Sequence, residues 1–338
     1  EAIESYEIDS IYIGGGTPSC YGAKRIVEIL DELKRIGNVR LDSEITVEVN
    51  PDTTKLEELK LLRAEGVNRL SIGVQSANND ILKIIGRRHN FRQAEIAVDT
   101  AREAGFENVS LDLIYGLPSQ TRGDWADTLS RALELHPEHL SCYGLKLEEG
   151  TPMYRSYLGS PLIPDEDEQA DMYLYTVDTL AHYGLKQYEI SNFARPGHMC
   201  VHNLKYWNCD EYLGFGVSAH SYFNGTRFSF TPDIERYMQG VTVKDSKVRI
   251  TDECEQVEER ERMGEYVMLR LRLVAGVDSR EFNYRFGRSF EQLYGGKCEK
   301  FIKNGYMTMR GGVYSLTPAG MFISNYILSD ILEFEDFG

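Results

Sequence analysis

The strongest constraint on the fold is a unit of β-rich run, turn and amphipathic helix that repeats through residues 1–190. The first of these helices has apolar residues three and four positions apart, which gives it one face to bury. Strands that alternate with helices in this way form a parallel sheet, either a barrel or an open doubly wound sheet. The expected strands are Ser10–Ile13, Glu44–Val49, Arg69–Val74, Val109–Ile114 and His139–Leu145.

Helix starts carry their own signal, a small polar residue followed three positions later by Glu, Gln or Asp. The two side chains of such a capping box satisfy each other's backbone N–H groups. The acidic run Asp165–Glu168 is interpreted as another first turn, because the helix dipole favours carboxylates there. The expected capping boxes are Thr54 with Glu57, Asn90 with Gln93, and Thr121 with Asp124.

The strands indicate which kind of sheet forms, because each has one apolar face and one small or polar face. In the second strand, Ile45, Val47 and Val49 alternate with polar residues, and the third and fourth strands alternate likewise. A closed eight-stranded barrel would fill its interior with bulky aliphatic side chains. We therefore expect a splayed, partial barrel that holds a polar ligand near the carboxyl ends of its strands. An open sheet with one solvated face is the alternative, although parallel sheets are usually covered on both faces.

The rest of the chain differs in pattern from the barrel region, residues 1–190. After an expected strand at Gln187–Ile190, residues 191–250 are rich in aromatic side chains, and residues 222–228 predict a hairpin with a type I′ turn. Residues 251–338 show three helices, a hairpin around Gly311-Gly312 and a terminal helix from Thr317. This order predicts a small winged-helix-like domain.

Charge and composition narrow the function classes. The formal net charge of −16 disfavours nucleic-acid binding, so a DNA-binding regulator that uses the winged helix is the least favoured function. No apolar run is long enough to span a bilayer, and the first ten residues lack the basic and apolar regions of a signal peptide. The six cysteines are dispersed, which is typical of reduced thiols. We expect a cytoplasmic protein.

Several chemically active side chains occur near the ends of the expected strands. The run Gly14-Gly15-Gly16-Thr17-Pro18 lets backbone N–H groups approach a ligand, although its spacing matches neither a Rossmann fingerprint nor a P-loop. Each polar residue alone could be a core hydrogen bond, a cap or a surface ion pair. Together they suit a zwitterionic ligand with ribose hydroxyls, because such a ligand would satisfy all of them. The polar residues are Glu48, Gln75, Arg87 and Asp112.

The motifs GGGTPS, EVNP, GVQS followed by GRRH, and DLIYGLP resemble those of the radical S-adenosylmethionine (SAM) enzymes related to oxygen-independent coproporphyrinogen III oxidase, the HemN-like family. The resemblance runs from about residue 9 through the terminal domain. It implies a partial (β/α)6 barrel, a HemN-type C-terminal domain and a [4Fe-4S] cluster. The SAM-binding positions that it implies are Gly15, Gly16, Thr17, Glu48, Gln75, Arg87 and Asp112.

One family motif does not occur in the chain, the CxxxCxxC run that binds the cluster on the loop after the first barrel strand. The sequence begins without Met, just before the second strand of the family pattern. We expect the first strand and the cluster loop to be absent from this sequence, with the cluster cysteines upstream. A natural paralogue that has lost its cluster is the alternative. Without those thiolates the chain alone is not expected to cleave SAM.

The segment 202–207, HNLKYW, matches the HNxxYW signature and within the family resembles the haem chaperones of the HemW type. This resemblance implies haem as the ligand, acceptor hemoproteins as partners and an electron donor for the cluster. His202 is the candidate iron ligand, and Tyr206 and Trp207 offer flat faces to a porphyrin. A hydrogen-bonded histidine that only holds the loop is the alternative for His202.

The competing enzymatic function is oxidative decarboxylation of coproporphyrinogen III to protoporphyrinogen IX, which the HNxxYW segment disfavours. The sequence leaves two further questions open: whether SAM cleavage belongs to the function, and whether the protein forms a homodimer. No catalytic residue is assigned.

Overall fold

A computed structural model describes residues 6–243 and 246–332, and the chain divides into two compact units, Glu1–His202 and Asn203–Gly338. The first unit is built on a seven-stranded sheet in the order β1-β2-β3-β4-β5-β7-β6. Strands β1 to β5 are parallel neighbours in chain order, whereas β7 runs antiparallel to both of its neighbours, β5 and β6. The strands are β1 (Glu7–Ile13), β2 (Asn38–Val49), β3 (Arg69–Gln75), β4 (Val109–Tyr115), β5 (His139–Gly144), β6 (Lys186–Gln187) and β7 (Asn192–Ala194).

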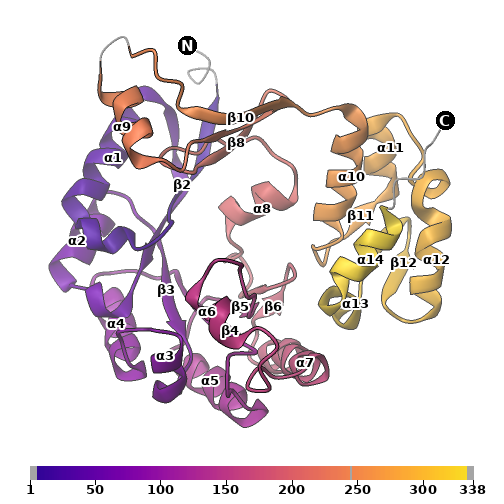
Figure 1. The fold of residues 1–338 in the computed structure, drawn as a ribbon, viewed down its shortest axis with the longest axis horizontal. Helices are drawn as coiled ribbons and strands as arrows, with labels where there is room; N and C mark the ends of the chain where they lie inside the picture. The colour runs from indigo at the N-terminus through magenta and orange to yellow at the C-terminus, as the bar shows by residue number, and fades with distance from the viewer. Residues whose placement is uncertain (1–5, 244–245, 333–338) are drawn as a thin grey trace. The chain divides into compact units, whose positions relative to one another are not determined.

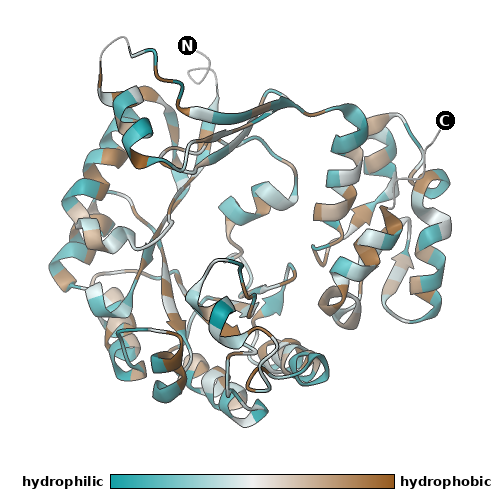
Figure 2. Cartoon of the chain, in the orientation of Figure 1, coloured by the Kyte–Doolittle hydropathy of each residue, from teal (hydrophilic) through white to brown (hydrophobic). Residues whose placement is uncertain are grey.

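Helices cover the outer side of this curled sheet, which makes it the expected partial barrel. In Figure 1, α1, α2, α4 and α5 follow one another around the strands, and Figure 2 shows apolar and polar residues alternating along them, as in helices with one buried face. The helices of this unit are α1 (Ala23–Ile36), α2 (Leu56–Ala64), α3 (Asn79–Ile84), α4 (Phe91–Glu103), α5 (Arg122–Glu134), α6 (Pro152–Tyr157) and α7 (Glu166–His182), with 3₁₀ turns at Pro18–Tyr21 and Pro51–Thr53.

Two of the three expected capping boxes form. Asn90 and Thr121 each cap a helix reciprocally with the residue three positions on, and the acidic run starts α7 with a capping box at Asp165. The expectation for Thr54 was wrong. Its hydroxyl donates to the Asn50 carbonyl at 3.0 Å, so it closes a 3₁₀ turn, and α2 begins at Leu56 without a side-chain cap.

The expected strand Gln187–Ile190 was also wrong. The chain instead forms two very short strands, β6 and β7, on either side of a tight turn in which the Tyr188 N–H donates to the Asn192 carbonyl at 3.1 Å. Because β6 and β7 are antiparallel to each other, this turn joins them without a crossover helix. Glu189, which was expected to lie in a strand, thus lies in this turn and is fully buried.

The register of the parallel strands confirms the two faces of the sheet. Val47, Leu70 and Val109 lie side by side on the face toward the helices, and all three are fully buried. On the other face Thr46 neighbours Arg69. Near the amino ends of the strands, polar and aromatic groups of segment 188–202 fill this inner face. The candidate site lies on the same face, near the carboxyl ends of the strands.

The second unit begins inside helix α8 (Val201–Trp207) and has two sheets. The first contains β8 (His220–Phe223), β9 (Thr226–Phe230) and β10 (Thr251–Gln256), with helix α9 (Ile234–Thr242) between β9 and β10. The turn between β8 and β9 has positive φ at both central residues, Asn224 at 50° and Gly225 at 73°. These angles confirm the expected type I′ turn.

The terminal domain has the helices and hairpin that the sequence predicts, with one further strand. β11 (Val277–Asp278) adds to the hairpin of β12 (Met307–Arg310) and β13 (Val313–Leu316), packed with a core of aromatic rings around Phe282. None of the helices in the described ranges is long and apolar enough to cross a membrane. The helices of the domain are α10 (Glu259–Arg270), α11 (Ser279–Phe286), α12 (Gly296–Lys303), α13 (Pro318–Phe322) and α14 (Ser324–Ile331), with a π-helical turn at Glu291–Gly295.

The apolar face of the sheet provides a stability prediction. Leu70→Ala removes a fully buried side chain from β3 and should lower the free energy of unfolding by about 2–5 kcal/mol. Leu41→Ala, on an exposed part of β2, is the matched control and should change it by less than about 0.5 kcal/mol. Urea unfolding followed by circular dichroism measures both. Equal effects of the two variants would contradict this assignment of faces.

Candidate functional site

The glycine-rich loop after β1 is held by the carboxylate of Glu48. One oxygen accepts a hydrogen bond from the Gly15 N–H at 3.1 Å, and the other accepts from the Tyr12 hydroxyl at 2.8 Å. A Cβ at Gly14 would lie 2.7 Å from the Tyr12 ring and 2.9 Å from the Glu48 carboxyl carbon, so no larger residue fits there. Gly15 has φ +85° and Gly16 has φ +81°. The loop therefore presents an open, exposed backbone next to a carboxylate.

Thr17 at the end of this loop has a structural contact of its own. Its hydroxyl oxygen accepts a hydrogen bond from the Asn50 side-chain amide at 3.0 Å, which ties the loop to the carboxyl end of β2. Next to it, the Ser19 and Thr53 hydroxyls lie 2.6 Å apart. These contacts fix the loop between β1 and α1 against the end of β2.

Asp112 lies on the inner face of β4. Its carboxylate accepts hydrogen bonds from the Ser71 hydroxyl, which lies 3.0 Å from both oxygens. Burial raises the pKa of Asp112, and hydrogen bonds from Ser141 and Ser71 oppose that rise. The carboxylate thus points into the sheet's interior with neutral hydroxyl donors around it.

Gln75 ends β3 in a strained conformation. It has φ +67°, in the left-handed region that non-glycine residues seldom adopt, and the β3–β4 register shifts between Gly73 and Gln75. Its amide nitrogen lies 3.0 Å from the place that a Cβ of Gly73 would occupy. Strain of this kind clusters at functional sites, because the surrounding structure must hold it.

Arg87 follows α3 and is half-buried. Burial lowers the pKa of its guanidinium, while the charges of Asp112 and Asp52 raise it. The structure therefore brings Glu48, Gln75, Arg87 and Asp112 to one end of the inner face, with Gly15 to Thr17 in the adjoining loop. A carboxylate pair, one cation and an open glycine backbone fit the polar groups of SAM.

His202 lies at the end of the first unit, against β1 and β2. Its Nδ1 is 3.0 Å from the Ser10 hydroxyl, and its ring stacks on Tyr12 with centroids 5.3 Å apart and planes inclined by 27°. The carboxylate of Glu44 accepts the backbone N–H groups of Val201 and His202, each at 3.0 Å. The first turn of α8 is therefore fixed by a side chain of β2.

Sequence reasoning did not single out Tyr12, Glu44 or Arg69. They share the inner face with Thr46, so the alternation of each strand was the signal that could have found them. Arg69 is buried, and charged side chains rarely are. Among the described residues, the buried side-chain atoms without a hydrogen-bond partner on this unit's inner side are Thr46 Oγ1, Arg69 Nε, Glu189 Oε1 and Asn192 Oδ1.

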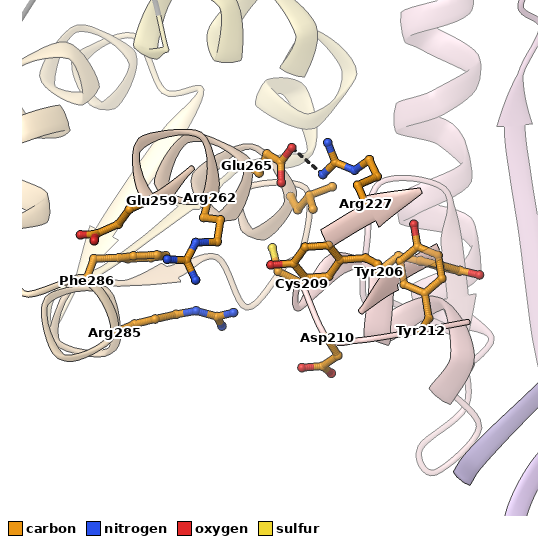
Figure 3. Close-up of a pocket in the computed structure, with 12 residues that line it drawn as sticks. Tyr206, Cys209, Asp210, Tyr212, Arg227, Glu259, Arg262, Glu265, Arg285 and Phe286 are labelled. Carbon is orange, nitrogen blue, oxygen red and sulfur yellow. Dashed lines mark hydrogen bonds and ion pairs between the residues drawn. The ribbon is translucent and has the colours of Figure 1, made fainter. Parts of the chain in front are cut away.

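Tyr206, one of the residues expected to contact haem, lines a pocket in the second unit of about 470 Å³ (Figure 3). Its ring meets that of Tyr212 edge-on, with centroids 4.6 Å apart and an angle of 79°. Trp207 follows on the same helix and is half-buried. His202, which the sequence grouped with these two, has its described contacts in the first unit.

Within the described ranges, no group of three or more His, Cys, Asp or Glu residues could hold a metal ion. The described cysteines form no disulfide: Cys142, Cys200 and Cys298 are buried, Cys209 is half-buried, and Cys20 and Cys254 are exposed. The described residues thus do not supply the ligands of an iron–sulfur cluster.

Comparison with known proteins places the chain in a family. A model of the radical SAM superfamily matches residues 1–132, and a model of the HemN C-terminal domain matches residues 257–323. The chain is 36% identical over 328 residues to "Heme chaperone HemW" of Bacillus subtilis, with 96% of this chain and 86% of that protein covered. The chain belongs to the HemW family. The Escherichia coli protein of the same name is 33% identical over 329 residues, which is 95% of this chain and 83% of that protein.

The HemW-family chain also resembles a solved structure. Coproporphyrinogen III oxidase (HemN) from Escherichia coli superposes with a TM-score of 0.83 at 23% identity, covering 98% of this chain and 79% of that one. At this identity the likeness shows the fold alone. It confirms the partial barrel followed by a HemN-type C-terminal domain. Membership of the superfamily implies SAM and a [4Fe-4S] cluster as cofactors.

The buried carboxyl of Glu189 provides a pH prediction. Burial raises its pKa to about 7 from 4.5, partly offset by hydrogen bonds from the Ser191 and Asn192 backbones and the Asn192 side chain. The folded state therefore binds a proton that the unfolded state has lost, and stability falls as the pH rises from about 4.5 to 7. A shift of this size corresponds to about 3 kcal/mol.

Glu189→Gln should remove this pH-dependent loss of stability. Relative to the original protein, the variant should gain free energy of unfolding between pH 5 and pH 7.5, which urea midpoints at the two pH values measure. Glu149→Gln, at an exposed position, is the control and should show no such gain. A constant difference between the Glu189 variant and the original protein at both pH values would contradict the assignment.

Proposed function

We propose that the protein is a haem chaperone, which binds haem and delivers it to acceptor hemoproteins. The observation that carries the proposal is the identity of 33–36% to heme chaperones HemW over nearly the whole chain. The HNxxYW segment supports it, because α8 carries a histidine whose orientation is held by Ser10 and Glu44. Since Nδ1 contacts Ser10, iron ligation would use Nε2, the usual division of roles in a metal-binding imidazole.

The inner face of the barrel is proposed to bind SAM. Glu48 and Asp112 suit the hydroxyls and the ammonium group of the ligand, Arg87 suits its carboxylate, and the exposed backbone from Gly15 to Thr17 can approach it closely. SAM, when bound, supplies a sulfonium whose carbon–sulfur bond can be cleaved by reduction. The residues of this chain bind and orient it, and the strained Gln75 turn keeps its amide at the same edge of the sheet.

The [4Fe-4S] cluster is implied by the superfamily, but the described residues offer no set of thiolates for it. No step of the haem proposal passes through the cluster. The electron donor, a homodimer and a cytoplasmic location stay predictions.

His202→Ala tests the haem proposal. Loss of an axial imidazole should weaken haem binding about tenfold or more and shift the Soret band, since the iron loses a strong ligand. A haem titration followed by absorbance measures both quantities. His198→Ala is the matched control, because this nearby imidazole lies outside the motif and is within hydrogen-bond distance of the Pro196 carbonyl, at 3.2 Å. An unchanged titration of the His202 variant would remove this residue from the haem site.

The same protein should not restore oxygen-independent coproporphyrinogen III oxidase activity to a strain that lacks it. Restoration of decarboxylation would overturn the chaperone proposal in favour of the enzymatic alternative. Stoichiometric haem binding without decarboxylation, followed by transfer to an apo-hemoprotein, would support the chaperone.

A second variant tests the SAM proposal. Asp112→Asn combined with Gln75→Ala removes a carboxylate and an amide from the inner face and should weaken SAM binding about tenfold or more. Calorimetric titration of SAM measures this effect. Asp127→Asn, with an exposed side chain on α5, is the control and should bind SAM like the original protein. An unaltered isotherm for the double variant would contradict a ligand on this face.

A further inference from the structure

The pocket in the second unit contains two arginines without an acidic partner. Arg262 on α10 and Arg285 on α11 both line it, and no described carboxylate lies within ion-pair distance of either guanidinium. Figure 3 shows both side chains reaching into the pocket from one side, opposite Tyr206 and Cys209. Arg227 differs, because it is paired with Glu265 at 2.6 Å.

The acidic residues of the pocket do not neutralise this pair. Glu265 is engaged by Arg227, and the carboxylate of Glu259 points away from the two guanidinium groups in Figure 3. Asp210 lies on the opposite wall, in the loop after α8. The thiol of Cys209 adds no negative charge, since burial raises its pKa to about 11. The two guanidinium groups are thus able to bind an anionic ligand.

Aromatic rings make up much of the rest of the pocket. Tyr206 and Tyr212 form one wall, and Phe286 lies on the side of the arginines. The Arg285 guanidinium is 5.1 Å from the ring centroid of Tyr266 and 5.7 Å from that of Phe286, contacts that hold it in place. Flat apolar walls beside two cations select a ligand with a flat apolar body and two anionic groups.

We propose that this pocket binds the propionate carboxylates of haem, with Arg262 and Arg285 as the residues that hold them. The proposal rests on the haem-chaperone function and names the residues of the second unit that would hold the carboxylates of the ligand. Arginine binds a carboxylate through two parallel hydrogen bonds, so two arginines match two propionates. The volume of about 470 Å³ is within the range of roughly 300–1,000 Å³ that small-molecule sites occupy. Tyr206 belongs both to this pocket and to the HNxxYW segment.

The test combines protein variants with a modified ligand. Haem and haem dimethyl ester, which lacks the two carboxylates, are titrated into the original protein and into the variant Arg262→Gln/Arg285→Gln. The original protein should bind haem at least about tenfold more tightly than the ester, because the ester cannot form charge-assisted hydrogen bonds. The double variant should lose about tenfold or more in haem affinity and bind the two ligands within about twofold of each other. The Soret position should not change, since iron ligation is untouched.

Two control proteins separate specific from general effects. Arg288→Gln removes an exposed arginine just beyond α11 and should bind haem like the original protein. Arg262→Lys/Arg285→Lys keeps the charge and should recover part of the affinity. Urea midpoints verify that the variants fold. If the original protein prefers haem over the ester and the double variant keeps the full preference, the pocket does not hold the propionates.

Failure of the chaperone proposal can be recognised separately by titrating metal-free protoporphyrin IX, which has the carboxylates and no iron. Binding that is lost in the double arginine variant supports the pocket even if haem affinity proves independent of His202. An original protein that binds neither haem nor protoporphyrin IX overturns both proposals. An original protein that binds haem and its ester equally overturns the pocket proposal and leaves the chaperone function standing.

Discussion

A charged side chain buried inside a parallel sheet needs a partner, and this requirement shapes the first unit. Arg69 and Glu44 lie on the inner face of neighbouring strands, and both are buried. An unpaired charge there would cost several kcal/mol, so the chain must bring groups that can bind it. Segment 188–202 supplies such groups for Glu44, whose carboxylate accepts hydrogen bonds from the Cys200 thiol and the first N–H groups of α8. The inner face thus determines where α8 begins.

The same constraint couples the glycine loop to His202 within this unit. Glu48 accepts hydrogen bonds from the loop backbone at Gly15 and from the Tyr12 hydroxyl, and the Tyr12 ring stacks on His202. The three contacts form a continuous chain from the proposed SAM site to the proposed haem ligand.

Most helices and strands could be predicted from local sequence patterns. Most candidate site residues could be predicted from the alternation of polar and apolar residues along each strand. All five expected parallel strands form, because each pairs one apolar face with one polar face. The turn at Asn224-Gly225 and the capping boxes at Asn90 and Thr121 depend only on neighbouring residues, and they were predicted correctly. The β6–β7 turn was missed because its partner, β5, lies far along the chain. The pocket arginines gave no signal at all, since Arg262 and Arg285 meet only through the packing of α10 and α11.

The two ends of the HNxxYW segment make different kinds of contact. Its histidine is oriented by hydrogen bonds and stacking with residues of β1 and β2, whereas Tyr206 packs edge-on against Tyr212 beside the arginine pocket. The two haem proposals therefore rest on separate observations. The proposed iron ligand is argued from contacts of His202 within the first unit, and the proposed carboxylate pocket from side chains of the second unit alone. Each proposal can accordingly fail without the other, and this is why their tests use different variants and different ligands.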